Sequence, residues 1–368
     1  MMGSQAVNDV DASSARVNPF ESHCTATGIN STDRAAWLAA RRTGLGGSDV
    51  AAILHLHPYK SALEVYADKV GASAPDADAG EIALWGHILE GPILAEFARR
   101  TKRTVLASGE LFKSKARRSL IVTPDGIQLD CAPRWAVGPG TAEVKTTGYG
   151  AQWHEEIPAY VQVQKQHEML VTGATWGSLI WLPLPERKLQ WFDVAPHREF
   201  QAMLAEKCSE FWLRVIERRP PDPDGSESAR RALHALHPEL DDQTIELDQD
   251  AEAVADEAER IAAAIAALEE RKKLISNRVI ATLGSEKVAL LSSGRYWNSW
   301  TCEPRETKCP SCDAVTGTTA GFRAVRLMQP RKKPHPLPVE RRSLATPASA
   351  EIAKLLEASL ESVRRGAA

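Results

Sequence analysis

Two carboxylates and one ammonium group are the side chains of this sequence best suited to chemistry. Asp125 follows a short apolar stretch and lies in a turn between a proline and a glycine. Glu143 and Lys145 are two residues apart in a strand-like segment, so both point to one face while Val144 points into the core. Oxygen ligands suit Mg²⁺ or Mn²⁺, and a buried acid pair favours a bound cation. These residues indicate a divalent-metal site; taken alone, they also fit a turn followed by an exposed Glu–Lys pair.

Further polar side chains lie in two predicted helices. Glu90 has mainly apolar neighbours within the helical region Ile82–Thr101, and a carboxylate there is costly unless it is paired or liganded. The amphipathic helix predicted for Ile157–Thr172 carries four polar side chains on or near one face, namely Tyr160, Gln164, His167 and Glu168. Such groups can bind phosphate oxygens or orient water, although each pattern also fits an ordinary helix surface.

A glycine-rich turn precedes a predicted helix start near residue 48. Its three glycines lie within Arg41–Asp49, with Ser48 or Asp49 as the helix cap. Backbone N–H groups at such a start, together with Arg42, can bind a terminal phosphate. The turn is neither a dinucleotide fingerprint nor a P-loop, because no Gly-Lys-Ser/Thr follows the glycines.

The hydrophobic patterns predict a scaffold for these groups over residues 34–218. Strands are predicted at Leu120–Thr123, Ala142–Lys145, Trp176–Leu182 and Leu189–Val194. Helices are predicted at Ser48–Leu54, Ser61–Lys69, Ile82–Thr101, Ile157–Thr172 and Phe200–Glu217. Helices that flank a small central sheet make an α/β core.

Composition narrows the class of protein. The chain has 368 residues, with 45 Lys and Arg against 48 Asp and Glu, and 43% of its residues are hydrophobic. This composition excludes collagen-like, wholly disordered and disulfide-scaffold proteins. The longest apolar run has eight residues, too short for a membrane span of about 20. The first residues lack the features of a signal peptide, and six cysteines in a chain of this length form no disulfide framework. We therefore expect a cytoplasmic protein with reduced thiols.

The patterns divide the chain into six parts. They are a flexible N-terminal arm (1–33), the α/β core (34–218), a linker (219–249), a helical arm (250–284), a β-rich segment with a Cys-containing insertion (285–328), and a basic Pro-rich tail with a short helix (329–368). In the helical arm, apolar residues recur at alternating intervals of four and three residues from Val254 to Val279. They form the heptad seam of a coiled coil, which Lys272 interrupts once. This seam can mediate self-association or pack back on the core.

Charge is distributed in blocks along the chain. Residues 99–118 hold eight basic residues and one Glu, residues 239–259 hold ten acids and no bases, and residues 323–342 hold seven bases and one Glu. A basic block is most often a solvated face, but it can also form the local patch through which a protein binds nucleic acid.

Three cysteines near the C-terminus have the spacing of an incomplete metal site. Cys302, Cys309 and Cys312 supply three ligands, whereas a structural zinc site takes four. Asp313, His335 or Cys24 are candidates for the fourth position. An iron–sulfur cluster held by Cys24 and the other three cysteines is an alternative, and so is an inserted hairpin with reduced thiols, which the incomplete spacing favours.

Taken together, the motifs resemble those of YqaJ-type viral recombinases, relatives of phage lambda exonuclease with the PD-(D/E)xK nuclease fold. The resemblance covers roughly residues 35–215 and begins with Arg-Thr-Gly-Leu-Gly-Gly-Ser-Asp at 42–49. Further motifs follow in the family's order: Trp85-Gly to Glu90, Pro124-Asp125-Gly, Glu143-Val-Lys145, and Gln164 to Val171-Thr172-Gly173. The resemblance implies a restriction-endonuclease-like core with a small mixed sheet flanked by helices. The heptad spacing adds a C-terminal helical, coiled-coil arm.

The resemblance also implies roles for individual residues. Asp125 and Glu143 would ligate Mg²⁺ or Mn²⁺, with Glu90 contributing from its helix, and Lys145 would contact the scissile phosphate or the attacking water. Gln164 would support this site. Two further positions, Arg42 and Ser48, would hold the 5′-phosphate of the trimmed strand.

The implied function is a metal-dependent exonuclease that digests duplex DNA ends 5′ to 3′ in phage-type recombination. Its implied partners are an annealing protein, which receives the single strand, and further copies of the chain in a ring-like trimer. Two alternatives stay open: a non-catalytic DNA-end-binding or adaptor protein, and a repair nuclease with a cysteine-ligated cluster.

Overall fold

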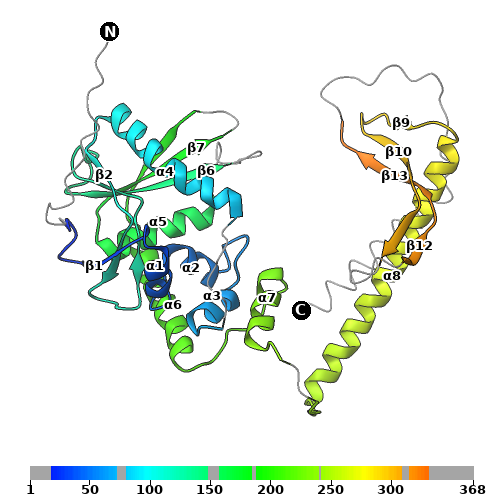
Figure 1. Ribbon diagram of the computed structural model, residues 1–368, viewed down its shortest axis with the longest axis horizontal. Coiled ribbons are helices and arrows are strands. Elements are labelled where there is room, and N and C mark those ends of the chain that lie inside the picture. Colours follow the sequence, from blue (N-terminus) through cyan, green and yellow to red (C-terminus); the bar gives the residue numbers. More distant parts are fainter. Residues whose placement is uncertain are drawn as a thin grey trace, which may run out of the picture. The chain divides into compact units, whose positions relative to one another are not determined.

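The computed structural model describes residues 18–72, 80–147, 157–184, 188–239, 242–308 and 315–330. The chain divides into two compact units, residues 1–241 and residues 242–368 (Figure 1). The predicted basic Pro-rich tail and its short helix lie almost entirely outside the described residues.

A mixed five-stranded sheet forms the centre of the first unit. Its strand order is β2–β5–β6–β7–β8, with β2 at Val105–Ala107, β5 at Gly126–Gln128, β6 at Gly140–Thr147, β7 at Gly177–Pro183 and β8 at Gln190–Val194. β6 and β7 are parallel, and helix α5 (Ala159–Thr172) connects them, because a parallel pair needs a crossover. The other neighbouring strands are antiparallel.

One helix covers each face of this sheet beside β6 (Figure 1). α4 (Gly80–Thr101) packs Phe97 and its neighbours against Val144 and Ile180. On the other face, Val161 of α5 packs with Leu179 and Trp181. Successive side chains of a strand point to opposite faces, so the residues of β6 that do not face α4 face α5.

A second sheet and the remaining helices complete this unit. The sheet has the order β1–β3–β4, with β1 at Cys24–Asn30, β3 at Glu110–Ser114 and β4 at Ile121–Val122. The helices are α1 (Arg34–Arg41), α2 (Gly47–Ile53), α3 (Ala62–Lys69), α6 (Arg198–Ile216) and α7 (Glu227–Leu236). α2 packs against α3, α5 and α6, and this places the glycine-rich turn next to α5.

The structure corrects two of the predicted boundaries. The predicted loose arm contains β1, which pairs antiparallel with β3 and buries Cys24. The predicted linker contains α7, which packs against α3 and bonds to it through Ser228 Oγ, the acceptor for Ser61 N at 2.8 Å. The first unit therefore runs to residue 241 and not to residue 218.

The second unit consists of a long helix and a β-structure. α8 spans Gln249–Leu283, and a three-stranded sheet follows in the order β13–β10–β9, with β9 at Val288–Leu290, β10 at Tyr296–Cys302 and β13 at Phe322–Met328. β11 (Arg305–Lys308) and β12 (Val315–Thr319) form a separate pair. Within the described chain, no helix combines the length and apolar character needed to cross a bilayer.

The heptad seam of α8 is only partly covered within its own unit. Val279 and Leu283, near the end of the helix, are buried together with Tyr296. Further toward the start of the helix, five aliphatic seam side chains are 43–66% exposed: Val254, Ile261, Ile265, Leu268 and Ile275.

Candidate active site

The alternation of β6 positions the first acid and the lysine. Val144 is buried against α4, so Glu143 and Lys145 point toward α5, as the sequence predicts. Glu143 is 3% exposed, and its Oε1 lies 2.5 Å from Lys145 Nζ. The same oxygen accepts a hydrogen bond from Nε2 of Gln164 on α5. The parallel crossover thus brings a carboxylate, an ammonium and an amide to one point.

Asp125 joins this group from the preceding strand. It lies directly before β5, and its Oδ2 accepts a hydrogen bond from the backbone N–H of Val144 at 2.7 Å. Burial raises the pKa of Asp125 well above its ordinary value, the negative charges of Glu143 and Glu90 raise it further, and Lys145 opposes the shift. The carboxyl group therefore lies close enough to both acids to be affected by their charge.

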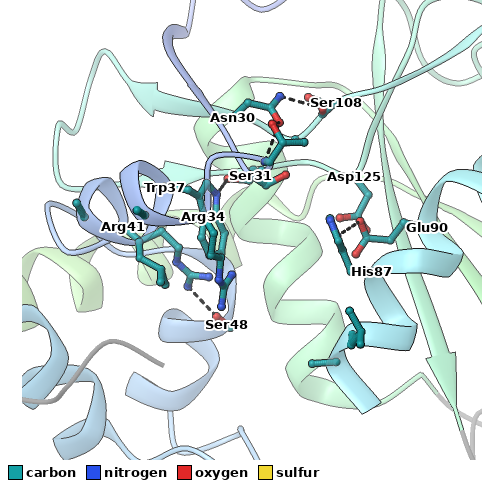
Figure 2. A pocket seen from close by; sticks show the side chains of 18 of the residues that line it. Asn30, Ser31, Arg34, Trp37, Arg41, Ser48, His87, Glu90, Ser108 and Asp125 are labelled. Atoms are coloured by element: carbon teal, nitrogen blue, oxygen red, sulfur yellow. Dashed lines mark hydrogen bonds and ion pairs between the residues drawn. The ribbon is translucent and has the colours of Figure 1, made fainter. Parts of the chain in front are cut away.

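Glu90 approaches from α4. Its Oε2 lies 3.1 Å from His87 Nδ1, and burial raises its pKa, with Glu143 adding to the shift. Figure 2 shows Glu90 and Asp125 side by side, at one side of a hollow. The three predicted acids and Lys145 therefore converge.

This donor set fits a hard divalent cation. The charge of Glu143 adds to the raised pKa of Asp125 and of Glu90, so these two carboxyl groups would gain from a nearby positive charge. Within the described ranges, no three His, Cys, Asp or Glu side chains form a cluster that could hold a metal ion. Asp125 and Glu143 are the pair that would hold such an ion, and Mg²⁺ commonly binds one or two carboxylates together with water and substrate phosphates.

A large cavity of about 1310 Å³ opens beside these acids. Glu90 and Asp125 line one side (Figure 2). Arg34 and Arg41 of α1 lie on the opposite side (Figure 2). Arg42 and Lys60 also line the cavity, together with the acids Glu64 and Asp68. A cavity that is cationic on one wall and acidic on the other can hold a polyanion against a metal site.

Trp37 lies between two arginines of the basic side of the cavity and contacts both. The guanidinium groups of Arg34 and Arg41 each lie 4.8 Å from the centre of its ring, and its Nε1 donates to Thr123 Oγ1 at 3.0 Å. Stacking of this kind holds the planes of the two guanidinium groups in place.

Arg41, which the sequence motifs did not single out, is the arginine that contacts Ser48. Its Nη2 donates to Ser48 Oγ at 3.1 Å. Arg42, which was predicted to hold the 5′-phosphate together with Ser48, lines the same cavity, but its Nε donates to Asp68 Oδ1 at 3.3 Å. A phosphate at Ser48 would therefore meet Arg41 first.

Asp49 is a further residue whose importance sequence reasoning missed. It is fully buried at the start of α2, and three cations surround it: Lys60 and Lys69 at 2.9 Å, and Arg41 at 3.5 Å. Burial alone would raise the pKa of Asp49, but these cations hold it well below its usual range. Asp49 thus orients two of the basic groups that line the cavity.

The two other predicted residues of α5 are buried. His167 has its Nε2 2.9 Å from the carbonyl oxygen of Ile121. Glu168 pairs with the buried Lys165 at 2.9 Å, but it also lines a small cavity with Glu143 and Gln164, and burial together with the charge of Glu143 raises its pKa to about 7. None of the basic residues at 99–118, a stretch fully described, lines the large cavity, and Arg103 forms a bidentate pair with Asp193 instead.

The cysteine prediction falls largely outside the described residues. Cys309 and Cys312 lie there, as do Asp313 and His335. Cys24 is fully buried in the core of the first unit, and this burial raises its pKa to about 11, which disfavours the thiolate that a metal needs. A metal or cluster at Cys302, Cys309 and Cys312 stays a prediction.

Comparison with known proteins gives one family and one curated relative. Residues 36–175 match the family described as the YqaJ-like viral recombinase domain. The uncharacterized protein YqaJ of Bacillus subtilis (strain 168) is 29% identical over 214 residues, which cover 56% of this chain and 65% of the relative. The match thus spans slightly less than two thirds of the relative's length.

Solved structures give weaker likenesses. The alkaline exonuclease LHK-Exo from Laribacter hongkongensis is 17% identical, with 55% of this chain and 99% of that chain covered and a TM-score of 0.40. A phage-related exonuclease from Haemophilus somnus 129PT is 9% identical, with 50% and 99% covered and a TM-score of 0.35. These likenesses are too weak to support a functional argument. The family comparison confirms the resemblance that the motifs predicted: residues 36–175 of this chain match the YqaJ-like viral recombinase domain.

Proposed function

We propose that this protein is a metal-dependent exonuclease that hydrolyses phosphodiester bonds from the ends of duplex DNA in phage-type recombination. The observation that carries the proposal is the convergence of Asp125, Glu143 and Lys145 beside a cavity with a basic opposite wall. The match to a viral recombinase domain supports the same substrate class.

The two sides of the cavity would bind different phosphates of the DNA. A terminal 5′-phosphate would bind Arg41 and Ser48, because a charged bidentate donor and a hydroxyl are already hydrogen-bonded to each other there. The scissile phosphodiester would then lie at the acids. Holding the 5′ end in this way leads to 5′ to 3′ digestion, and the basic wall makes binding weaken as salt rises.

The acids and their neighbours would carry the chemistry of a PD-(D/E)xK nuclease. Asp125 and Glu143 would hold Mg²⁺ or Mn²⁺, with Glu90 contributing from α4. A bound ion lowers the pKa of water and stabilises negative charge on phosphate oxygens. Lys145 stabilises the charge that develops on the phosphate, and Gln164 keeps the Glu143 carboxylate in place.

Two kinds of partner belong to this proposal. Digestion of one strand leaves single-stranded DNA, which an annealing protein would receive. Copies of this chain would assemble into a ring-like trimer around the substrate, and such closure favours processive digestion.

The test is digestion of end-labelled duplex with and without Mg²⁺. We compare the parent with Lys145→Ala and Glu143→Gln, and use Lys207→Ala as control, because Lys207 is an exposed lysine paired with Glu210 on α6. We expect the first two variants to lose about 10²- to 10³-fold in rate and the control to match the parent. Equal cleavage by all four proteins refutes the site, and DNA-end binding by the parent without any cleavage favours an adaptor.

A further inference from the structure

An aromatic cluster of His57, Tyr59 and Tyr160 borders the site and takes no part in the chemistry proposed above. The ring centres of His57 and Tyr59 are 6.2 Å apart in an edge-on arrangement, and those of His57 and Tyr160 are 5.6 Å apart. Tyr59 is 79% exposed, whereas Tyr160 is partly buried on α5. The cluster thus extends from the core to the surface.

The inner end of the cluster lies near the lysine of the site. Burial raises the pKa of Tyr160, and the positive charge of Lys145 opposes that shift, so the phenol is close to the ammonium group. Burial and the charge of Lys60 lower the pKa of His57, which therefore stays a neutral aromatic ring at neutral pH.

The outer end of the cluster joins two cavities. His57 and Lys60 line both the large cavity and a second cavity of about 370 Å³, which Tyr59 and Arg231 also line. The loop that carries the two rings is fixed, because the backbone N–H of His57 donates to Ala51 and that of Tyr59 donates to His57 Nδ1. The exposed ring of Tyr59 is therefore carried by a fixed backbone loop beside the second cavity, next to His57, which lines both cavities.

We propose that the ring of Tyr59, supported edge-on by His57, is a stacking platform for a base of the strand being digested, at a nucleotide next to the scissile phosphodiester. The inference rests on the proposed function. A base whose phosphate reaches buried acids must leave the duplex stack, and an aromatic ring replaces part of the lost stacking without sequence preference. Lys60, paired with Asp49, and Arg231, paired with Glu64, are the cations of the second cavity, which Asp224 and Glu227 also line, and they would contact the phosphates on either side of such a base.

The cleavage test compares normal duplex with duplex whose terminal nucleotides are abasic. In Tyr59→Ala we expect kcat/KM on normal duplex to fall about 5- to 150-fold, and no comparable loss on the abasic duplex. Tyr59→Phe keeps the ring and should behave like the parent. Trp135→Ala is the matched control, because Trp135 is 55% exposed in the same unit and lines neither cavity.

A binding test separates this inference from the proposed function. In EDTA, a duplex with 2-aminopurine near its 5′ end should change fluorescence when it binds the parent and Tyr59→Phe, and not when it binds Tyr59→Ala. If the parent never cleaves DNA but gives this Tyr59-dependent signal, the proposed function is wrong and the platform stands. If Tyr59→Ala matches the parent in the signal, or loses equal activity on normal and abasic ends, the platform is refuted and the exposed ring serves another partner.

Discussion

The ammonium of Lys145 and the carboxylate of Glu143 are paired at 2.5 Å along one face of β6. The pair leaves Glu143 partly neutralised, and its Oε1 is shared with the side-chain amide of Gln164. Gln164 therefore positions the acid and has no need to touch the substrate.

Gln164→Ala should lower activity by about 10- to 100-fold and raise the Mg²⁺ concentration needed for half-maximal rate, since partners that orient metal ligands have effects of this size. Gln162→Ala is the control, because Gln162 is exposed on the same helix and donates to Ile157. Mg²⁺ titrations of both variants check the prediction. An unchanged Mg²⁺ requirement in Gln164→Ala would contradict it.

Arg41 should determine the preference for phosphorylated ends. Removing a hydrogen bond to a charged group costs about 1.5–3 kcal/mol, so Arg41→Ala should lower kcat/KM on 5′-phosphorylated duplex by about 10- to 150-fold. Its effect on 5′-hydroxyl duplex should be smaller. Arg42→Ala, whose arginine is paired with Asp68, should show the smaller change of the two on phosphorylated ends. A larger loss of kcat/KM in Arg42→Ala than in Arg41→Ala would indicate that Arg42 binds the phosphate.

Asp49→Asn should destabilise the protein by about 3–5 kcal/mol, because it leaves three cations beside a neutral, buried side chain. The pKa of Asp49 is held below its ordinary value of 3.8, so its contribution is present above that pH and is lost as the pH falls further. Urea unfolding at several pH values should show the difference between parent and variant shrinking below pH 3.8. Glu210→Gln, at an exposed pair, should change stability by about 0–1 kcal/mol.

Most of the central scaffold could be predicted from the sequence, because regularly spaced apolar residues in a long segment indicate both the type of element and its buried face. The predicted helix Ile157–Thr172 corresponds to α5, and the strands on either side of it correspond to β6 and β7. β1, β3 and α1 were not predicted. They are short, and the pairing of β1 with β3 joins residues 80 to 90 positions apart.

The site was predictable where its residues are near one another in sequence, as Glu143 and Lys145 are. The role of Asp49 was not, because its cations come from residues 41, 60 and 69, which meet only in the folded chain. Arg41 and Arg42 are adjacent, and local sequence does not indicate which of them turns toward Ser48. The structure resolves this through Trp37, which stacks on Arg41.

The exposed seam of α8 should mediate self-association. Burying large aliphatic side chains is favourable, so Ile265→Glu combined with Leu268→Glu should lower the mass measured by sedimentation at a given concentration. Ala263→Glu, placed on the opposite side of the helix by its spacing from Ile261 and Ile265, should leave the mass unchanged. If the double variant assembles like the parent, the seam contacts another part of the same chain or a different protein.

β5 and β6 form an antiparallel hairpin, and the hydrogen bond from Val144 N–H to Asp125 connects the start of β5 to the middle of β6. Together with the pairing of Gly126 with Ala142, it fixes the position of Asp125 relative to Glu143 along the two strands. This register does not depend on the length of the connection between β5 and β6. The carboxylates should therefore keep their spacing when the middle of the connection at 129–139, between its anchored ends at Asp130 and Val137, changes in length or composition, which makes it a natural place for insertions.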